Sequence, residues 1–131
     1  MFRNLVAAAA LLAGLAPACA AQEPCGGGQQ IVLVGRYGSA PSQTAVVILK
    51  SQVRPWPAKS DRVVGWCFGG PNVVRVDGEF LAVNGLSRSR ISPGGIACKT
   101  GRHPLKDGYD QSAERDAFSD AANRILNAAC D

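Results

Sequence analysis

Two glycine-containing dipeptides, Asp77-Gly78 and Asn84-Gly85, divide the segment 72–91 into three short runs rich in valine and leucine. Both dipeptides favour the two-residue turn of a β-hairpin, because both central residues of that turn take a positive φ. The segment is therefore predicted to form a three-stranded antiparallel meander. No other part of the chain carries so specific a local signal.

The two predicted turns also fix the register of the meander. Side chains alternate between the two faces of a strand, which gives one apolar face made of Val74, Val76, Leu81, Val83 and Leu86. The same register places Glu79 opposite Arg90 and predicts an ion pair between them. It also places Arg88 and Arg90 on one face of the third strand.

Three further runs upstream have strand composition: 31–37, 44–50 and 62–68. The intervening segment 38–43 is predicted to be a loop, and so is the non-periodic segment 92–110. With the meander, these runs predict an antiparallel sheet of five or six strands.

The C-terminal segment 111–130 differs from the rest because it is rich in alanine and lacks glycine and proline. It predicts one helix, capped by Asp110 or Ser112. Its expected core-facing stripe consists of Ala113, Ala117, Phe118, Ala121, Ile125 and Ala128. The predicted fold class is α+β, a small antiparallel sheet packed against this single helix.

The beginning of the chain predicts a cleaved leader over 1–21. Arg3 precedes a short apolar run, and small residues follow Pro17. The apolar run is too short for a transmembrane anchor. A lipid anchor on Cys19 is disfavoured, because Ala16 stands where bacterial lipoproteins usually carry a large aliphatic residue. Residues 22–131 are then expected to form one small exported domain, periplasmic or secreted.

Without Cys19, four cysteines remain, which in a small exported protein predicts two disulfides among Cys25, Cys67, Cys98 and Cys130. The sequence leaves the pairing open, and we expect Cys25–Cys67 and Cys98–Cys130. A metal site is disfavoured, because no two of these cysteines stand as a close pair such as C-x-x-C. No cofactor is expected.

Charge is distributed unevenly. Residues 50–106 hold ten Lys or Arg and three acids, a net charge of +7, whereas residues 107–131 hold six acids and two arginines, a net charge of −4. Within the basic part, one group is a candidate site for an anionic partner: Arg88, Arg90, Lys99, Arg102, His103 and Lys106. The alternative is a solvated basic face that balances the acidic helix. The window 88–106 contains no aromatic residue for base stacking, which disfavours nucleic acid.

Trp56 stands between two prolines, and it is predicted to be either a lid over the core or an exposed anchor for a partner, with the lid favoured. His103 is the only histidine. A small hydrolase using His103 with Asp107 or Asp110 is an alternative, although no nucleophile motif such as G-x-S-x-G accompanies it.

These features favour a non-enzymatic exported binding module, such as an inhibitor, an immunity-type protein or an envelope accessory protein. Its partner would be a protein or an anionic component of the envelope. The hydrolase and a purely structural envelope component remain as alternatives.

Overall fold

The structure, a computed structural model, describes residues 25–26 and 29–131. The predicted leader and Cys19 lie outside these residues. Eight strands in the described part of the chain form one sheet in the order β2-β1-β7-β8-β6-β5-β4-β3. Neighbouring strands are antiparallel except for β6 and β8, which run parallel. The strands are β1 (Val32–Gly35), β2 (Gly38–Pro41), β3 (Thr44–Leu49), β4 (Arg62–Cys67), β5 (Asn72–Val76), β6 (Glu79–Ala82), β7 (Gly95–Cys98) and β8 (Gly101–Asp107).

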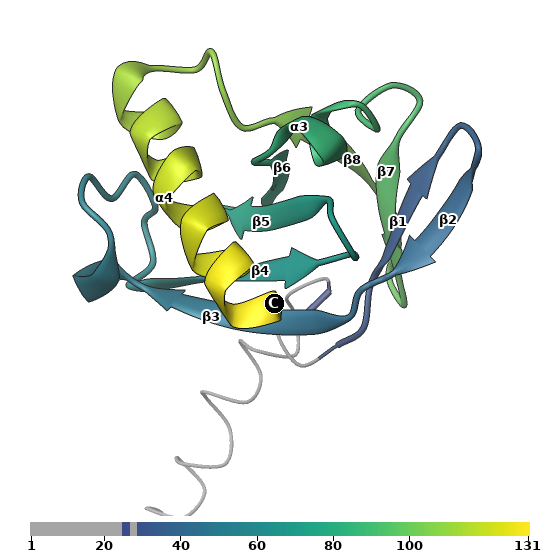
Figure 1. Cartoon of the computed structure of the whole chain (residues 1–131), viewed down its shortest axis with the longest axis horizontal. Helices are drawn as coiled ribbons and strands as arrows, with labels where there is room; N and C mark the ends of the chain where they lie inside the picture. The colour runs from purple at the N-terminus through teal and green to yellow at the C-terminus, as the bar shows by residue number, and fades with distance from the viewer. Residues whose placement is uncertain (1–24, 27–28) are drawn as a thin grey trace, which may run out of the picture.

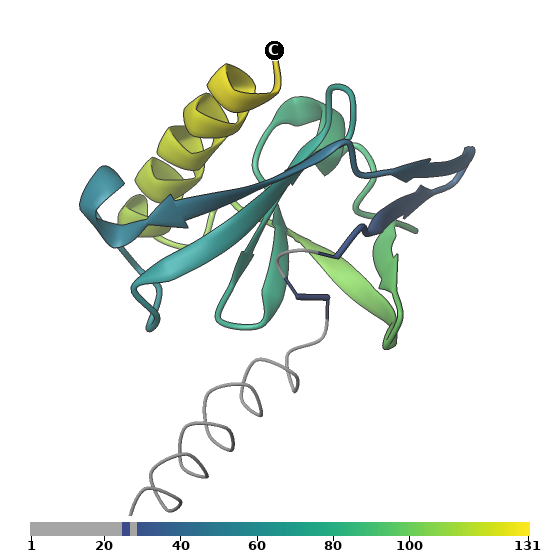
Figure 2. The ribbon, with the colours of Figure 1, turned by 90° about the horizontal axis from the view of Figure 1, so that it is seen from below.

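The sheet curls strongly, and the long helix α4 (Ala113–Cys130) lies across β3, β4 and β5 (Figures 1 and 2). Two short helical turns complete the fold, η1 (Lys50–Gln52) and α3 (Gly85–Arg88). A sheet packed against one C-terminal helix was predicted, as observed, but the prediction that the sheet is antiparallel throughout was wrong, because β6 and β8 run parallel. The strand number was wrong, because β2 falls in the segment predicted as a loop over 38–43, and β7 and β8 fall in the predicted loop over 92–110.

The hairpin of β5 and β6 confirms the first half of the predicted meander. Asp77 and Gly78 form its turn with φ of 48° and 87°, and Val74 faces Leu81 as expected. The second half was wrong, because Asn84 caps α3 instead of forming a turn. Its side chain accepts a hydrogen bond from the Ser87 backbone N–H at 3.0 Å.

With α3 in place of a third strand, β6 pairs with β8 on its free side. The predicted Glu79–Arg90 ion pair is therefore absent from the described structure, where Glu79 contacts Lys106 at 2.8 Å. Leu86, expected on the apolar face, is 58% exposed. Arg88 lies in α3 and Arg90 beyond its end, so the two do not share a strand face.

Both faces of the curled sheet are covered by apolar side chains. The first core lies between α4 and the sheet and contains the predicted apolar face of β5 and β6, together with Ile48, Phe118 and Leu126. The second core lies on the opposite face, where the curl brings distant strands together. Its large buried side chains are Ile31, Leu33, Trp66, Phe68, Val73, Phe80, Ile96 and Leu105.

The helix begins where predicted, because the Ser112 hydroxyl accepts the Arg115 backbone N–H at 3.0 Å. The predicted stripe was partly wrong, since Ala113, Ala117 and Ala128 are exposed. The buried residues are instead Phe118, Ser119, Ala122 and Leu126. Gly65 on β4 gives Leu126 room on this face of the helix. A Cβ atom there would lie 2.9 Å from Leu126 Cδ2, so a larger residue would force this leucine to shift.

The four cysteines form two disulfides, as predicted, but the expected pairing was wrong. The disulfides are Cys25–Cys98 and Cys67–Cys130. The first joins the chain before β1 to β7, and the second joins β4 to the end of α4. The predicted pairing failed because β7 was taken for a loop near the helix end, whereas it is a strand paired with β1. In the described residues, no helix has the length and apolar character needed to cross a membrane.

Candidate functional site

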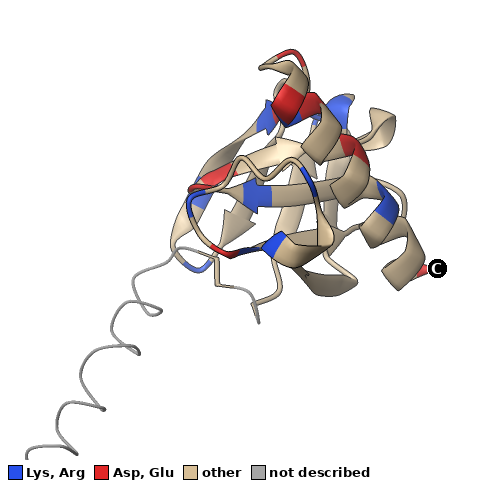
Figure 3. Cartoon of the chain, turned by 90° about the vertical axis from the view of Figure 1, so that its left-hand side faces the viewer, with Lys and Arg blue, Asp and Glu red and all other residues tan. Residues whose placement is uncertain are grey.

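The predicted basic group does not form one patch of free cations. Arg88 contacts Asp107 at 3.0 Å and Asp110 at 3.8 Å. Lys106 is paired with Glu79 at 2.8 Å. Figure 3 shows basic and acidic residues interspersed on the side of the molecule that carries α4. Arg88 and Lys106 therefore belong to a charged face on which acidic side chains balance the basic ones, which is the alternative interpretation given above.

Arg88 also contacts an aromatic ring, in addition to its two acidic partners. Its guanidinium lies 5.0 Å from the centre of the Tyr109 ring, a cation–π distance. The hydrogen bond to Asp107 raises the pKa of Arg88. These contacts tie α3 to the connection between β8 and α4, so this arginine is already engaged within the protein.

Tyr109 gives a prediction for alkaline solution. Its hydroxyl lies 2.8 Å from the Val83 carbonyl oxygen and 2.9 Å from Asp120 Oδ1, both hydrogen-bond acceptors. Burial, followed by the contact with Asp120, raises the pKa of Tyr109 to about 12. We expect ultraviolet titration to show one tyrosine ionising near this pH, and Tyr109→Phe to remove that step.

The sign of the stability effect follows from the same shift. The folded protein favours neutral Tyr109, and this preference stabilises the folded state against unfolding. The stabilisation is present below the ordinary tyrosine pKa of about 10. It is lost as the pH rises through about 12. A wild-type chain and Tyr109→Phe with the same pH dependence of unfolding over this range would contradict the assignment.

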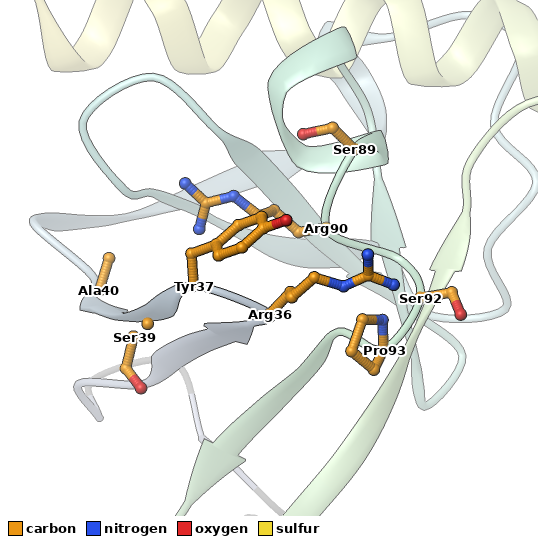
Figure 4. A pocket seen from close by; sticks show the side chains of 9 residues that line it. Arg36, Tyr37, Ser39, Ala40, Ser89, Arg90, Ser92 and Pro93 are labelled. Carbon is orange, nitrogen blue, oxygen red and sulfur yellow. The ribbon is translucent and has the colours of Figure 1, made fainter.

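A pocket of about 480 Å³ lies between the β1–β2 turn and the segment that joins α3 to β7 (Figure 4). Arg36 and Tyr37 form the two-residue turn, and Gly38 takes a φ of 141° that favours glycine. In Figure 4 the Arg36 side chain extends from this turn toward Pro93. The lining residues are Arg36, Tyr37, Gly38, Ser39, Ala40, Ser89, Arg90, Ser92 and Pro93.

Arg90 is positioned in the pocket by two glycines. A Cβ atom at Gly35 would lie 3.0 Å from Arg90 Cδ, so the bare backbone of β1 provides the surface on which this side chain lies. A Cβ atom at Gly94 would overlap the Arg90 carbonyl oxygen. The approach at Gly94 requires glycine because it involves backbone, whereas at Gly35 a Cβ atom would displace the Arg90 side chain.

The charge of this pocket has one sign. Arg36 and Arg90 both line it, and none of its lining residues is acidic. Among the described residues, neither arginine makes an ion pair. The side chain of Tyr37 at the same turn is 94% exposed. The pocket therefore combines two guanidinium groups, serine hydroxyls and an exposed aromatic ring.

The structure separates most of the predicted site residues. Arg90 alone of the six lines the pocket, while Lys99 lies in the exposed β7–β8 turn and Arg102 donates to the Pro93 carbonyl oxygen at 3.2 Å. Arg36 and Tyr37 were missed, because the run 31–37 was read as one strand. The signal for them was the pair of glycines that bracket a two-residue turn, Gly35 and Gly38.

His103 and the two aspartates proposed for a hydrolase do not come together. The nearest polar partner of His103 is Thr100, whose hydroxyl oxygen lies 3.1 Å from Nε2. Asp107 and Asp110 instead face Arg88. Because Asp107 follows four residues later on the same strand, it lies about 13 Å along that strand from His103.

Trp56 covers one end of the first core. Its ring meets the Phe118 ring edge-on, with 5.5 Å between the centroids, and its indole N–H donates to the Ser60 carbonyl oxygen at 2.8 Å. This arrangement agrees with a lid. The half-buried indole is engaged on both its apolar and its polar side.

The chain was compared with models of protein families, with curated proteins and with solved structures, and none of them matches it.

Proposed function

We propose that this protein is a non-enzymatic exported binding module whose pocket between Arg36 and Arg90 takes an anionic group of its partner. The observation that carries the proposal is the pocket itself, whose lining contains two arginines and no acidic residue. Two positive charges in the lining of one pocket, with no acidic residue beside them, attract an anion.

The chemistry of the lining favours a carboxylate or phosphate. The planar guanidinium donates two parallel hydrogen bonds to such groups. Ser39, Ser89 and Ser92 add hydroxyl groups that donate to the remaining oxygens. Tyr37 presents an exposed aromatic ring beside the charge, and rigid aromatic residues of this kind dominate the energetics of protein interfaces.

The two disulfides support an oxidising compartment, in agreement with the predicted leader. In such a compartment the suitable partners are a protein with an acidic surface or an anionic component of the envelope. An inhibitor, an immunity-type protein or an envelope accessory protein would each use a site of this kind.

The test is a titration with a short acidic peptide and with inorganic phosphate, followed by nuclear magnetic resonance of the backbone amides. We expect shifts to concentrate at Arg36, Tyr37 and Arg90. Arg36→Ala and Arg90→Ala should each weaken binding by about tenfold or more, since a hydrogen bond to a charged group is worth roughly 1.5–3 kcal/mol. Binding should also weaken as the salt concentration rises.

The matched control is Arg124→Ala, which removes the same charge from an exposed position on α4. Gly35→Ala provides a second test, because it keeps both arginines and displaces only the side chain of Arg90. If Arg124→Ala weakens binding as much as Arg90→Ala does, the effect is one of net charge and the pocket is not the site. If neither probe binds, a structural envelope component becomes the better interpretation.

A further inference from the structure

A second cluster lies away from the pocket, where the Cys25–Cys98 disulfide meets His103. One ligand atom from each of these three residues lies within 4.8 Å of the other two. The pairing of β7 with β8 brings this about. Ile96 faces His103 across the ladder, and Cys98, two residues further on, presents its side chain to the same face of the sheet.

Thr100 holds the cluster together in the tight turn between the two strands. Its hydroxyl oxygen lies 3.2 Å from Cys98 Sγ and 3.1 Å from His103 Nε2. The imidazole ring also packs near Phe80, with 5.8 Å between the ring centroids. The orientation of the imidazole is therefore fixed by neighbours, as is usual for a histidine that ligates a metal.

The other disulfide has no such surroundings. No histidine or acidic group joins Cys67 and Cys130 in a comparable cluster among the described residues. Cys67 is buried, and its sulfur lies 3.7 Å from the backbone oxygen of Leu126. The two disulfides thus differ in chemistry, and only Cys25–Cys98 has a nitrogen ligand beside it.

We propose that Cys25, Cys98 and His103 bind Zn²⁺ when their disulfide is reduced. Two thiolates and one imidazole are a zinc ligand set, and a water molecule would complete the tetrahedron. Cys25 closes the site on its buried side, whereas Cys98 and His103 are partly exposed and leave a path for the ion. The disulfide and the metal exclude each other, because both use the same sulfur atoms.

The disulfide must be reduced before Zn²⁺ can bind. A dithiol reductant supplies two electrons and two protons, the Cys25–Cys98 bond breaks, and the reductant becomes a disulfide. Zn²⁺ then displaces the two thiol protons into water as the thiolates bind it, while the imidazole binds in its neutral form.

The experiment uses Co²⁺ as a spectroscopic probe on the full chain carrying Cys19→Ser. The protein is reduced with a phosphine without oxygen, and the thiolate-to-cobalt charge-transfer absorption is recorded before and after Zn²⁺ is added. We expect a band that the oxidised protein lacks and that Zn²⁺ abolishes. His103→Gln should weaken Co²⁺ binding by about tenfold or more.

The matched controls are two double variants. Cys67→Ala/Cys130→Ala should keep the band, and Cys25→Ala/Cys98→Ala should lose it. If reduction unfolds the chain, circular dichroism replaces absorption as the readout, and Zn²⁺ should restore the fold only where Cys25 and Cys98 are present. The absence of a band and of refolding, a band that survives Cys25→Ala/Cys98→Ala, or one indifferent to His103→Gln would each overturn the proposal.

Discussion

Replacing both Cys67 and Cys130 with alanine will lower the free energy of unfolding by about 4 kcal/mol. These cysteines are 63 residues apart, and the chain-entropy model assigns about this value to the closure of a loop of that length. The disulfide also fixes the end of α4 to β4. Chemical denaturation followed by tryptophan fluorescence measures the change.

The matched control is Cys25→Ala/Cys98→Ala, which opens a loop of 73 residues. The model predicts nearly the same entropic loss for both double variants, since the dependence on loop length is logarithmic. A loss well below 1 kcal/mol for the Cys67/Cys130 variant would contradict the view that this disulfide stabilises the fold. A total stability of about 5–15 kcal/mol is typical of small domains, so the expected effect is a large fraction of it.

Phe118→Ala should cost about 3–5 kcal/mol, the usual range for removing a fully buried phenylalanine. Phe118 is fully buried in the first core between α4 and the sheet, and Trp56 packs edge-on against its ring. The variant therefore loses the ring contact as well as the buried surface. Denaturation gives the free energy, and the emission of Trp56 should shift toward that of a solvated indole.

Phe118→Leu is the control, because it keeps an apolar side chain in the same place. We expect it to cost distinctly less than Phe118→Ala and to leave Trp56 largely covered. An unchanged tryptophan emission in Phe118→Ala would show that Trp56 does not depend on this ring. The position of Trp56 over the first core would then depend on contacts other than Phe118.

The parts of the fold that sequence reasoning predicted are those whose signals are local. The Asp77-Gly78 turn and the alanine-rich helix with its Ser112 cap both depend on residues adjacent to one another. The hairpin turn predicted at Asn84-Gly85 was wrong for a physical reason. Asparagine favours a helix N-cap as strongly as a hairpin turn, and Ser87 three residues later decided between them.

The strands β7 and β8 could not be predicted from their own composition, because Pro104 lies inside β8 and glycines begin both strands. These two segments form strands because β7 pairs with one edge of β1 and β8 pairs with one edge of β6. The candidate pocket could not be predicted for the same reason, because it also depends on the pairing of distant strands. Arg36 and Arg90 are separated by more than fifty residues, and only the completed sheet brings the β1–β2 turn to the segment after α3.

The order of the strands has a consequence for the rate of folding. β2 and β3 are joined by only two residues, Ser42 and Gln43, yet they occupy the opposite ends of the sheet order. The sheet can reach this arrangement only after β1 has found β7, across about sixty residues of chain, and β6 has paired in parallel with β8. Contacts between residues so far apart must overcome a large loss of chain entropy before they add stability. We therefore expect the helix and the hairpin of β5 and β6 to form early, and closure of the curled sheet to be the slow step.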